Sequence, residues 1–294
     1  MTINFSNKTA IISGAAGGIG LALARELGQR GMNIVMADIE QQTLQASADT
    51  LAKEGINTLA CTLDVTEFEQ WQAVVEAAKQ RFGGVHMLIN NAGVGGIPSS
   101  IAETDANIWQ WVLDVNLTGV MFGGKAVTPA IKETGEGGWI INVASMAGMH
   151  GVPYATAYSA TKAAVVSLSE SWAVELKSQN IHVSALCPAF VKTRIHESLR
   201  TKQDKYATSV LKDKADELKK GFGQAAALVE SGIDAGLLAK RVVEALEHKQ
   251  MYIFTHPNYR DSVASRGKAL DYAFKDAVDS PLVKHLVDEE IVSL

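Results

Sequence analysis

Short apolar runs alternate with longer helical patterns along this chain, and that alternation restricts its fold more than any other feature. We expect strands at residues 9–13, 33–38, 58–64, 86–90, 139–143, 182–187 and 251–254. We expect helices at residues 19–30, 41–54, 67–82, 103–132 (continuous or broken), 155–178, 234–248 and 261–276. Several of the strands are apolar throughout, which is typical of strands covered on both faces. The pattern predicts an α/β fold, doubly wound, with a parallel seven-stranded sheet and helices on both faces.

The chain has 294 residues, and we expect them to form a single domain, residues 1–294. Hydrophobic residues make up 47% of the chain, which is enough for a sizeable core. Residues 191–230 are polar and lysine-rich and follow the last long strand, so we expect a substrate lid there. Residues 258–294 are expected to form a C-terminal extension.

Charge and composition argue against several kinds of partner. The net charge of -5 and the pI near 5.8 give no reason to expect nucleic acid or an anionic membrane surface. No apolar run reaches membrane-spanning length, and we expect no signal peptide, so no membrane partner is predicted. Cys61 and Cys187 are the only cysteines and fit a reduced, cytoplasmic setting best. No metal site is expected, because four histidines lack a partner at ligand spacing: His150, His182, His196 and His256.

A glycine-rich turn follows the first expected strand and opens the first expected helix. Glycines in this position let the backbone approach a pyrophosphate, which the helix N-terminus then stabilises. The loop residues that we expect against such a cofactor are Gly14, Gly17, Ile19 and Gly20. The turn therefore predicts a dinucleotide site.

The second expected strand ends at Asp38, and this residue bears on the choice of cofactor. A carboxylate here can accept a hydrogen bond from a ribose 2′-hydroxyl and would repel a 2′-phosphate. Ile39 follows it, and Ala15 and Ala16 occupy the loop, so we expect no Arg or Lys nearby to receive that phosphate. NAD is therefore favoured over NADP. The alternative is that Asp38 simply caps the next helix.

Tyr158 and Lys162 stand four residues apart on an expected helix and therefore share one helix face. A free tyrosine, with a pKa near ~10, is a poor base at neutral pH. A fixed ammonium beside the phenol would favour the phenolate and lower its pKa. By itself the spacing is weak evidence, since many solvated helices carry such a pair.

With these elements in order, the chain from about Lys8 to Thr193 resembles the short-chain dehydrogenase/reductase family, which has a Rossmann fold. The glycine loop has the family's pattern, with Ser13 where Thr is usual, and Asn90-Asn91-Ala92-Gly93 is highly characteristic. Ala189 departs from the pattern, because Gly usually follows the matching proline. The other matching residues are Asp64, Val65, Asn116, Ser145, Tyr158, Lys162, Pro188, Val191 and Thr193.

The resemblance implies hydride transfer between a nicotinamide and a secondary alcohol or ketone, with four catalytic residues. Tyr158 would donate and accept the proton, and Ser145 would hydrogen-bond the substrate oxygen. Lys162 would lower the Tyr158 pKa and hold the nicotinamide ribose, and Asn116 would anchor a water of the proton relay. Cofactor contacts are implied at Asp64, Val65, Asn91, Gly93, Tyr158, Lys162, Pro188, Val191 and Thr193. Family members commonly form dimers or tetramers, so we expect a homodimer or homotetramer.

Apolar residues that flank the catalytic segments are expected to form the wall of the substrate pocket. The pocket candidates are residues 94–97, Met146, Met149, Val152, Tyr154, Phe190 and Ile195.

Two other functions remain open. One alternative is an NADP-dependent biosynthetic carbonyl (3-oxoacyl-type) reductase of the same family, which Asp38 argues against. The other is a non-catalytic, dinucleotide-sensing regulator, which would be expected to lose part of the Ser145, Tyr158 and Lys162 set. The sequence does not identify the substrate.

Overall fold

The computed structural model describes residues 3–210 and 215–290, and for residues 215–220 and 222 it describes the backbone alone. The chain divides into two compact units, with the boundary in sequence between Thr255 and His256. The first unit contains the whole sheet and every residue expected in the site. Residues 211–214 of the expected lid lie outside the described residues, and the single domain remains a prediction.

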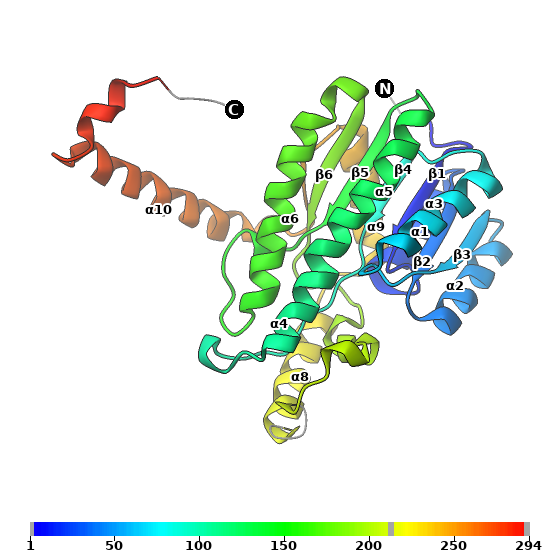
Figure 1. Ribbon diagram of the computed structural model, residues 1–294, viewed down its shortest axis with the longest axis horizontal. Helices are drawn as coiled ribbons and strands as arrows, with labels where there is room; N and C mark the ends of the chain where they lie inside the picture. The colour runs from blue at the N-terminus through cyan, green and yellow to red at the C-terminus, as the bar shows by residue number, and fades with distance from the viewer. Residues whose placement is uncertain (1–2, 211–214, 291–294) are drawn as a thin grey trace. The chain divides into compact units, whose positions relative to one another are not determined.

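A seven-stranded parallel sheet forms the centre of the first unit, in the order β3-β2-β1-β4-β5-β6-β7 (Figure 1). Its strands are β1 (Thr9–Ser13), β2 (Asn33–Asp38), β3 (Thr58–Thr62), β4 (Met87–Asn90), β5 (Gly138–Val143), β6 (Ile181–Cys187) and β7 (Tyr252–Phe254). The strand order reverses between β1 and β4, so a crevice is expected at their carboxyl ends.

Helices cover both faces of the sheet. One face packs against α1 (Gly18–Gln29), α2 (Gln41–Lys53) and α9 (Ala235–Glu247). The other packs against α3 (Phe68–Phe82), α4 (Ala106–Leu113), α5 (Gly119–Glu133) and α6 (Thr156–Glu175). Consecutive strand residues enter opposite cores, as Ile11 and Ile12 do, and this explains why the strands are apolar throughout. The predicted fold class is confirmed.

The helix expected at residues 103–132 is broken. A short 3-10 turn, Ile101–Glu103, precedes α4, and a π-helical segment, Asp114–Thr118, joins α4 to α5. Asp105 begins α4, because its side chain accepts hydrogen bonds from the backbone N–H groups of Asn107 and Ile108. The π segment matters for function because it carries Asn116, and such bulges are frequent at functional sites.

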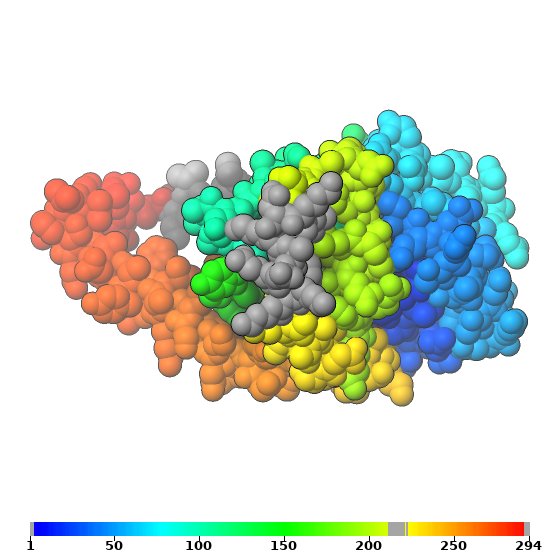
Figure 2. All heavy atoms as spheres, turned by 90° about the horizontal axis from the view of Figure 1, so that it is seen from below, coloured from blue at the N-terminus to red at the C-terminus, as the bar shows by residue number. Residues whose placement is uncertain are grey.

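The polar chain after β6 makes two 3-10 turns, Ile195–Thr201 and Asp204–Tyr206, before α8 (Ala215–Glu230). We call residues 194–208 the post-β6 segment. Side-chain hydrogen bonds join it to distant parts of the chain, including Tyr206 to Asp114 at 2.8 Å and Thr208 to Asp105 at 2.8 Å. Figure 2 shows this yellow-green stretch lying against the blue residues of the N-terminal strands and helices.

The second unit consists of a short 3-10 turn, Pro257–Tyr259, then α10 (Arg260–Asp279) and another 3-10 turn, Lys284–Asp288. This agrees with the helix expected at residues 261–276. None of the unit's described residues is buried. Among the helices that the structure describes, none is both long enough and apolar enough to cross a membrane.

Candidate active site

The glycine-rich loop lies at the carboxyl end of β1 and leads into α1. Gly14 and Gly18 adopt φ values of +66° and +55°, which glycine tolerates without strain. A Cβ on Gly20 would lie 2.2 Å from the Gly14 carbonyl oxygen, so only glycine allows the helix this close to the loop. At Gly17, the N-cap of α1, a Cβ would meet nothing within 4 Å. The loop therefore presents an open face at a helix N-terminus, which fits a pyrophosphate.

Asn91 holds this loop from the end of β4. Its side-chain Nδ2 donates to the carbonyl oxygens of Ser13 and Gly14, both at 2.9 Å. In return the Ser13 hydroxyl accepts from the backbone N–H groups of Asn91 and Ala92. Serine in place of the family's usual threonine thus keeps the hydroxyl that joins the two strand ends. A contact between Asn91 and a cofactor stays a prediction.

Asp38 faces the glycine loop from the end of β2. Its carboxylate accepts hydrogen bonds from the backbone N–H of Ala16 at 2.9 Å and of Glu40 at 3.0 Å. The N-cap residue of α2 is Glu40, so Asp38 is not the helix cap that the sequence left open. The carboxylate is held beside the loop, where it suits a ribose hydroxyl.

Asp64 and Val65 follow β3, as expected, but the Asp64 carboxylate is largely occupied within the protein. One oxygen accepts from the backbone N–H and the hydroxyl of Thr66, and the other accepts from Gln203 Nε2 at 3.0 Å. Val65 is buried, and a Cβ on Gly119 would lie 2.8 Å from its side chain. Close packing therefore fixes the backbone of both residues at this edge of the sheet.

Ser145 and Tyr158 come together at the carboxyl end of β5 and the start of α6. The Ser145 hydroxyl lies 3.4 Å from the carbonyl oxygen of Pro188 and close enough to the Tyr158 phenol to favour a lower pKa for that group. It also accepts from the backbone N–H of Ala147 at 3.1 Å, which fixes its position. Two hydroxyl groups therefore converge on one point, as is needed to hydrogen-bond a single substrate oxygen.

Lys162 is buried, with 3% of its surface exposed, and its Nζ donates to the carbonyl oxygen of Val143 at 2.8 Å. Burial lowers the Lys162 pKa to about 8, an effect that the nearby Cys187 thiol partly opposes. Nζ lies 5.6 Å from the centre of the Tyr158 ring. The two side chains share a helix face, as their spacing predicts.

The direction of the Tyr158 pKa differs from the expectation. Burial raises this pKa, and the nearby Ser145 hydroxyl opposes the shift without reversing it. The expected lowering by Lys162 is not found, because the ammonium is directed at the Val143 carbonyl and the desolvation of the phenol is the larger effect.

Asn116 is buried in the π segment next to these groups. Its Oδ1 accepts from the Val94 backbone N–H at 2.8 Å, and its Nδ2 donates to the Val94 carbonyl at 2.9 Å. A Cβ on Gly93 would lie 3.3 Å from Asn116 Oδ1 and 3.4 Å from Lys162 Nζ. Glycine at position 93 thus lets the backbone pass between these two side chains. The proposed role of Asn116 in anchoring a water is untested.

Of the other expected cofactor residues, one borders the glycine loop and two pack in or against the core on one face of the sheet. Thr193 borders the glycine loop, because a Cβ on Gly18 would lie 3.1 Å from its methyl group. Val191 is buried and forms an isolated bridge with Ile233, and Ile19 packs against the same core. A small hollow opens beside Tyr158, and the expected wall residues Ile97 and Tyr154 line it.

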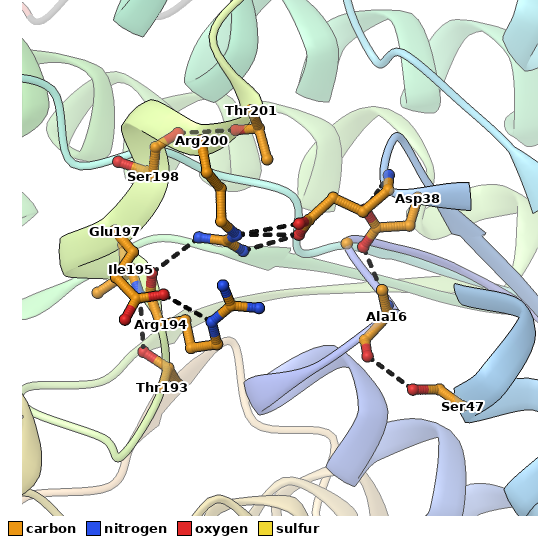
Figure 3. Close-up of polar contacts among 12 residues, drawn as sticks. Ala16, Asp38, Ser47, Thr193, Arg194, Ile195, Glu197, Ser198, Arg200 and Thr201 are labelled. Carbon is orange, nitrogen blue, oxygen red and sulfur yellow. Dashed lines mark hydrogen bonds and ion pairs between the residues drawn. The ribbon is translucent and has the colours of Figure 1, made fainter. Parts of the chain in front are cut away.

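Sequence reasoning missed the side chains that the post-β6 segment brings to the far end of the crevice. Arg200 forms an ion pair with Glu40 at 2.9 Å, and Lys205 forms one with Glu67 at 2.7 Å. An arginine thus reaches Glu40, two residues beyond Asp38, although no Arg or Lys was expected nearby to receive a 2′-phosphate. Figure 3 shows Arg200 pointing toward the end of β2, where Asp38 lies. No local sequence signal could reveal a pair that is 160 residues apart.

Comparison with known proteins identifies the family of this chain. The family model for short chain dehydrogenases matches residues 8–204, and the chain belongs to this family of oxidoreductases. A dehydrogenase/reductase of CLA biosynthesis from Lactiplantibacillus plantarum is 31% identical over 91% of this chain and 94% of its own. A 3-alpha-(or 20-beta)-hydroxysteroid dehydrogenase from Mycobacterium tuberculosis is 41% identical over 63% of this chain and 70% of its own. The crystal structure of a short chain dehydrogenase/reductase from Burkholderia phymatum in complex with NAD has a TM-score of 0.88 and 32% identity, with all of both chains covered.

Proposed function

We propose that the protein is an NAD-dependent oxidoreductase that interconverts a secondary alcohol and a ketone. The observation that carries the proposal is the convergence of the Ser145 and Tyr158 hydroxyls beside a buried Lys162, next to the glycine loop. The hydroxysteroid relative supports a secondary alcohol as the substrate class, and the NAD complex of the similar structure supports the cofactor.

Each catalytic residue has a separate role in the proposed reaction. A bound nicotinamide supplies the hydride acceptor or donor. Ser145 and Tyr158 hydrogen-bond the substrate oxygen, and Tyr158 takes its proton during oxidation and returns it during reduction. Lys162, on the same face of α6, holds a proton on a group whose pKa of about 8 suits exchange near neutral pH.

Asp38 supports NAD as the cofactor, since its carboxylate is held against the glycine loop by the N–H groups of Ala16 and Glu40. A 2′-phosphate beside this carboxylate would be repelled. An NADP-dependent reductase is the second candidate, and one observation bears on it: Arg200 lies near the same strand end. Its charge is matched by Glu40, so NAD remains the better proposal.

The test is the absorbance of reduced nicotinamide when the protein meets a panel of secondary alcohols, beginning with bulky cyclic and aromatic ones, with NAD and with NADP. The proposal predicts turnover of at least one such alcohol with NAD, and a lower kcat/KM with NADP. Turnover with NADP alone would contradict the cofactor assignment. Nucleotide binding without turnover of any alcohol or ketone would favour a sensing role instead.

A further inference from the structure

Arg200 is held firmly at the end of β2 by a forked ion pair. Its Nε lies 3.1 Å from each carboxylate oxygen of Glu40, and its Nη2 lies 2.9 Å from one of them. The remaining nitrogen, Nη1, donates to the backbone carbonyl of Arg194 at 3.0 Å. The two side chains are only 31% and 25% exposed. A guanidinium bound in this way has a fixed position and has its charge matched.

A second arginine of the same segment also has its charge matched by a carboxylate. Arg194 Nε donates to Glu197 at 2.7 Å. This hydrogen bond is the main cause that raises the pKa of Arg194, and Glu40 attracts the same guanidinium more weakly. Glu40 and Glu197 therefore match the charges of Arg194 and Arg200, and the backbone N–H of Glu40 bonds the Asp38 carboxylate. Figure 3 shows Arg194, Glu197 and Arg200 in the same close-up as Asp38 and Ala16 of the glycine loop.

Glu40 is also coupled directly to Asp38. The backbone N–H of Glu40 donates to the Asp38 carboxylate, so the side chain that pairs with Arg200 begins two residues from the expected ribose contact. A guanidinium presents a planar fork of donors that matches a phosphate. If Glu40 did not occupy that fork, Arg200 would offer a phosphate site close to the 2′ position of an adenosine ribose.

We propose that Glu40 is a second determinant of cofactor choice, because it occupies the Arg200 guanidinium that would otherwise bind a 2′-phosphate. This inference rests on the proposed use of a nicotinamide dinucleotide. Two effects then disfavour NADP. The Asp38 carboxylate repels the 2′-phosphate, and Glu40 forms an ion pair with the Arg200 guanidinium that would attract it. Substitution of Asp38 alone would leave the ion pair between Glu40 and Arg200 in place.

Calorimetric titration of the purified protein with NAD and with NADP tests the proposal without any catalytic step. The variants are Glu40→Gln, Arg200→Gln and the double variant. Glu40→Ser serves as a second replacement, because serine is a good N-cap residue for α2. The matched control is Glu54→Gln, which breaks a similar forked pair with Arg25, with distances of 2.8–3.1 Å.

In Glu40→Gln and Glu40→Ser, we expect the ratio of the NADP Kd to the NAD Kd to fall at least tenfold. Added salt should weaken the gain in NADP affinity. In Arg200→Gln the ratio should stay as large as in the wild type or larger, and in the double variant the gain should vanish. Glu54→Gln should leave the ratio unchanged.

Two results would overturn the inference: an unchanged ratio in both Glu40 variants, or a gain that survives in the double variant. A failure of the proposed function looks different. If the wild type binds neither dinucleotide, the cofactor assignment itself is wrong, whereas lost turnover with normal NAD binding leaves the role of Glu40 intact.

Discussion

Replacement of Lys162 by Met should change how the stability of the protein depends on pH. Burial lowers the Lys162 pKa from its ordinary 10.5 to about 8. Between these two values the unfolded chain binds a proton that the folded chain has released, so the free energy of unfolding rises with pH. This contribution is fully present above pH 10.5 and is lost as the pH falls through 8. At about 1.4 kcal/mol per pH unit, the difference between 10.5 and about 8 amounts to about 3 kcal/mol.

Urea unfolding of the wild type and of Lys162→Met, at several values between pH 7 and pH 10.5, measures this contribution. Met fills a similar volume without a charge, so the free energy of unfolding of the variant lacks this rise with pH. Its stability relative to the wild type should therefore fall by about 3 kcal/mol across the range. The exposed Lys177→Met controls for the loss of one positive charge.

Cys187 also titrates at high pH, but in the opposite sense. Burial raises its pKa from 9.0 to about 12, so it makes the folded state less stable as the pH rises above 9. Loss of Lys162 removes an attraction that lowers the Cys187 pKa, but the folded thiol stays protonated up to pH 10.5 in both proteins, so the difference between them reports the lysine. If that difference stays constant from pH 7 to pH 10.5, the ammonium is not desolvated as described, and the reasoning about the site fails.

Two further substitutions test how the fold supports the site. Gly20→Ala would place a Cβ 2.2 Å from the Gly14 carbonyl oxygen, so α1 must move and calorimetry should show at least a tenfold loss of NAD affinity. Gly267→Ala, where a Cβ meets nothing within 4 Å, is the control, and equal NAD affinity in both variants would contradict this. Asp105→Ala removes the cap of α4 and the acceptor for Thr208, so urea unfolding should show a loss of about 1–2 kcal/mol. A loss below about 0.3 kcal/mol would show that the cap contributes little.

The sheet could be predicted from the sequence because its signals are local. Residues 9–13 and 33–38 are short apolar runs bounded by polar or glycine residues, and β1 and β2 begin and end at those residues. Tyr158 and Lys162 share a face because a helix sets that spacing. The break near Asn116 depends on a π bulge, which the periodicity of the sequence does not reveal.

The electrostatics of the site could not be predicted in the same way. The Tyr158 pKa depends on how deeply the phenol is buried, and burial is a property of the packed structure. The pairing of Arg200 with Glu40 joins two segments that only the fold brings together. Roles that depend on contacts between distant segments therefore cannot be predicted from the sequence.

The central claim is that Tyr158 transfers the proton while the rest of the site binds the cofactor. The most direct measurement compares the kcat of Tyr158→Phe with that of the wild type on the best alcohol, together with the NAD Kd from calorimetry. The account predicts a fall in kcat of about 10²–10⁴-fold, with an NAD Kd that changes by no more than about twofold. Undiminished alcohol oxidation by Tyr158→Phe would contradict it.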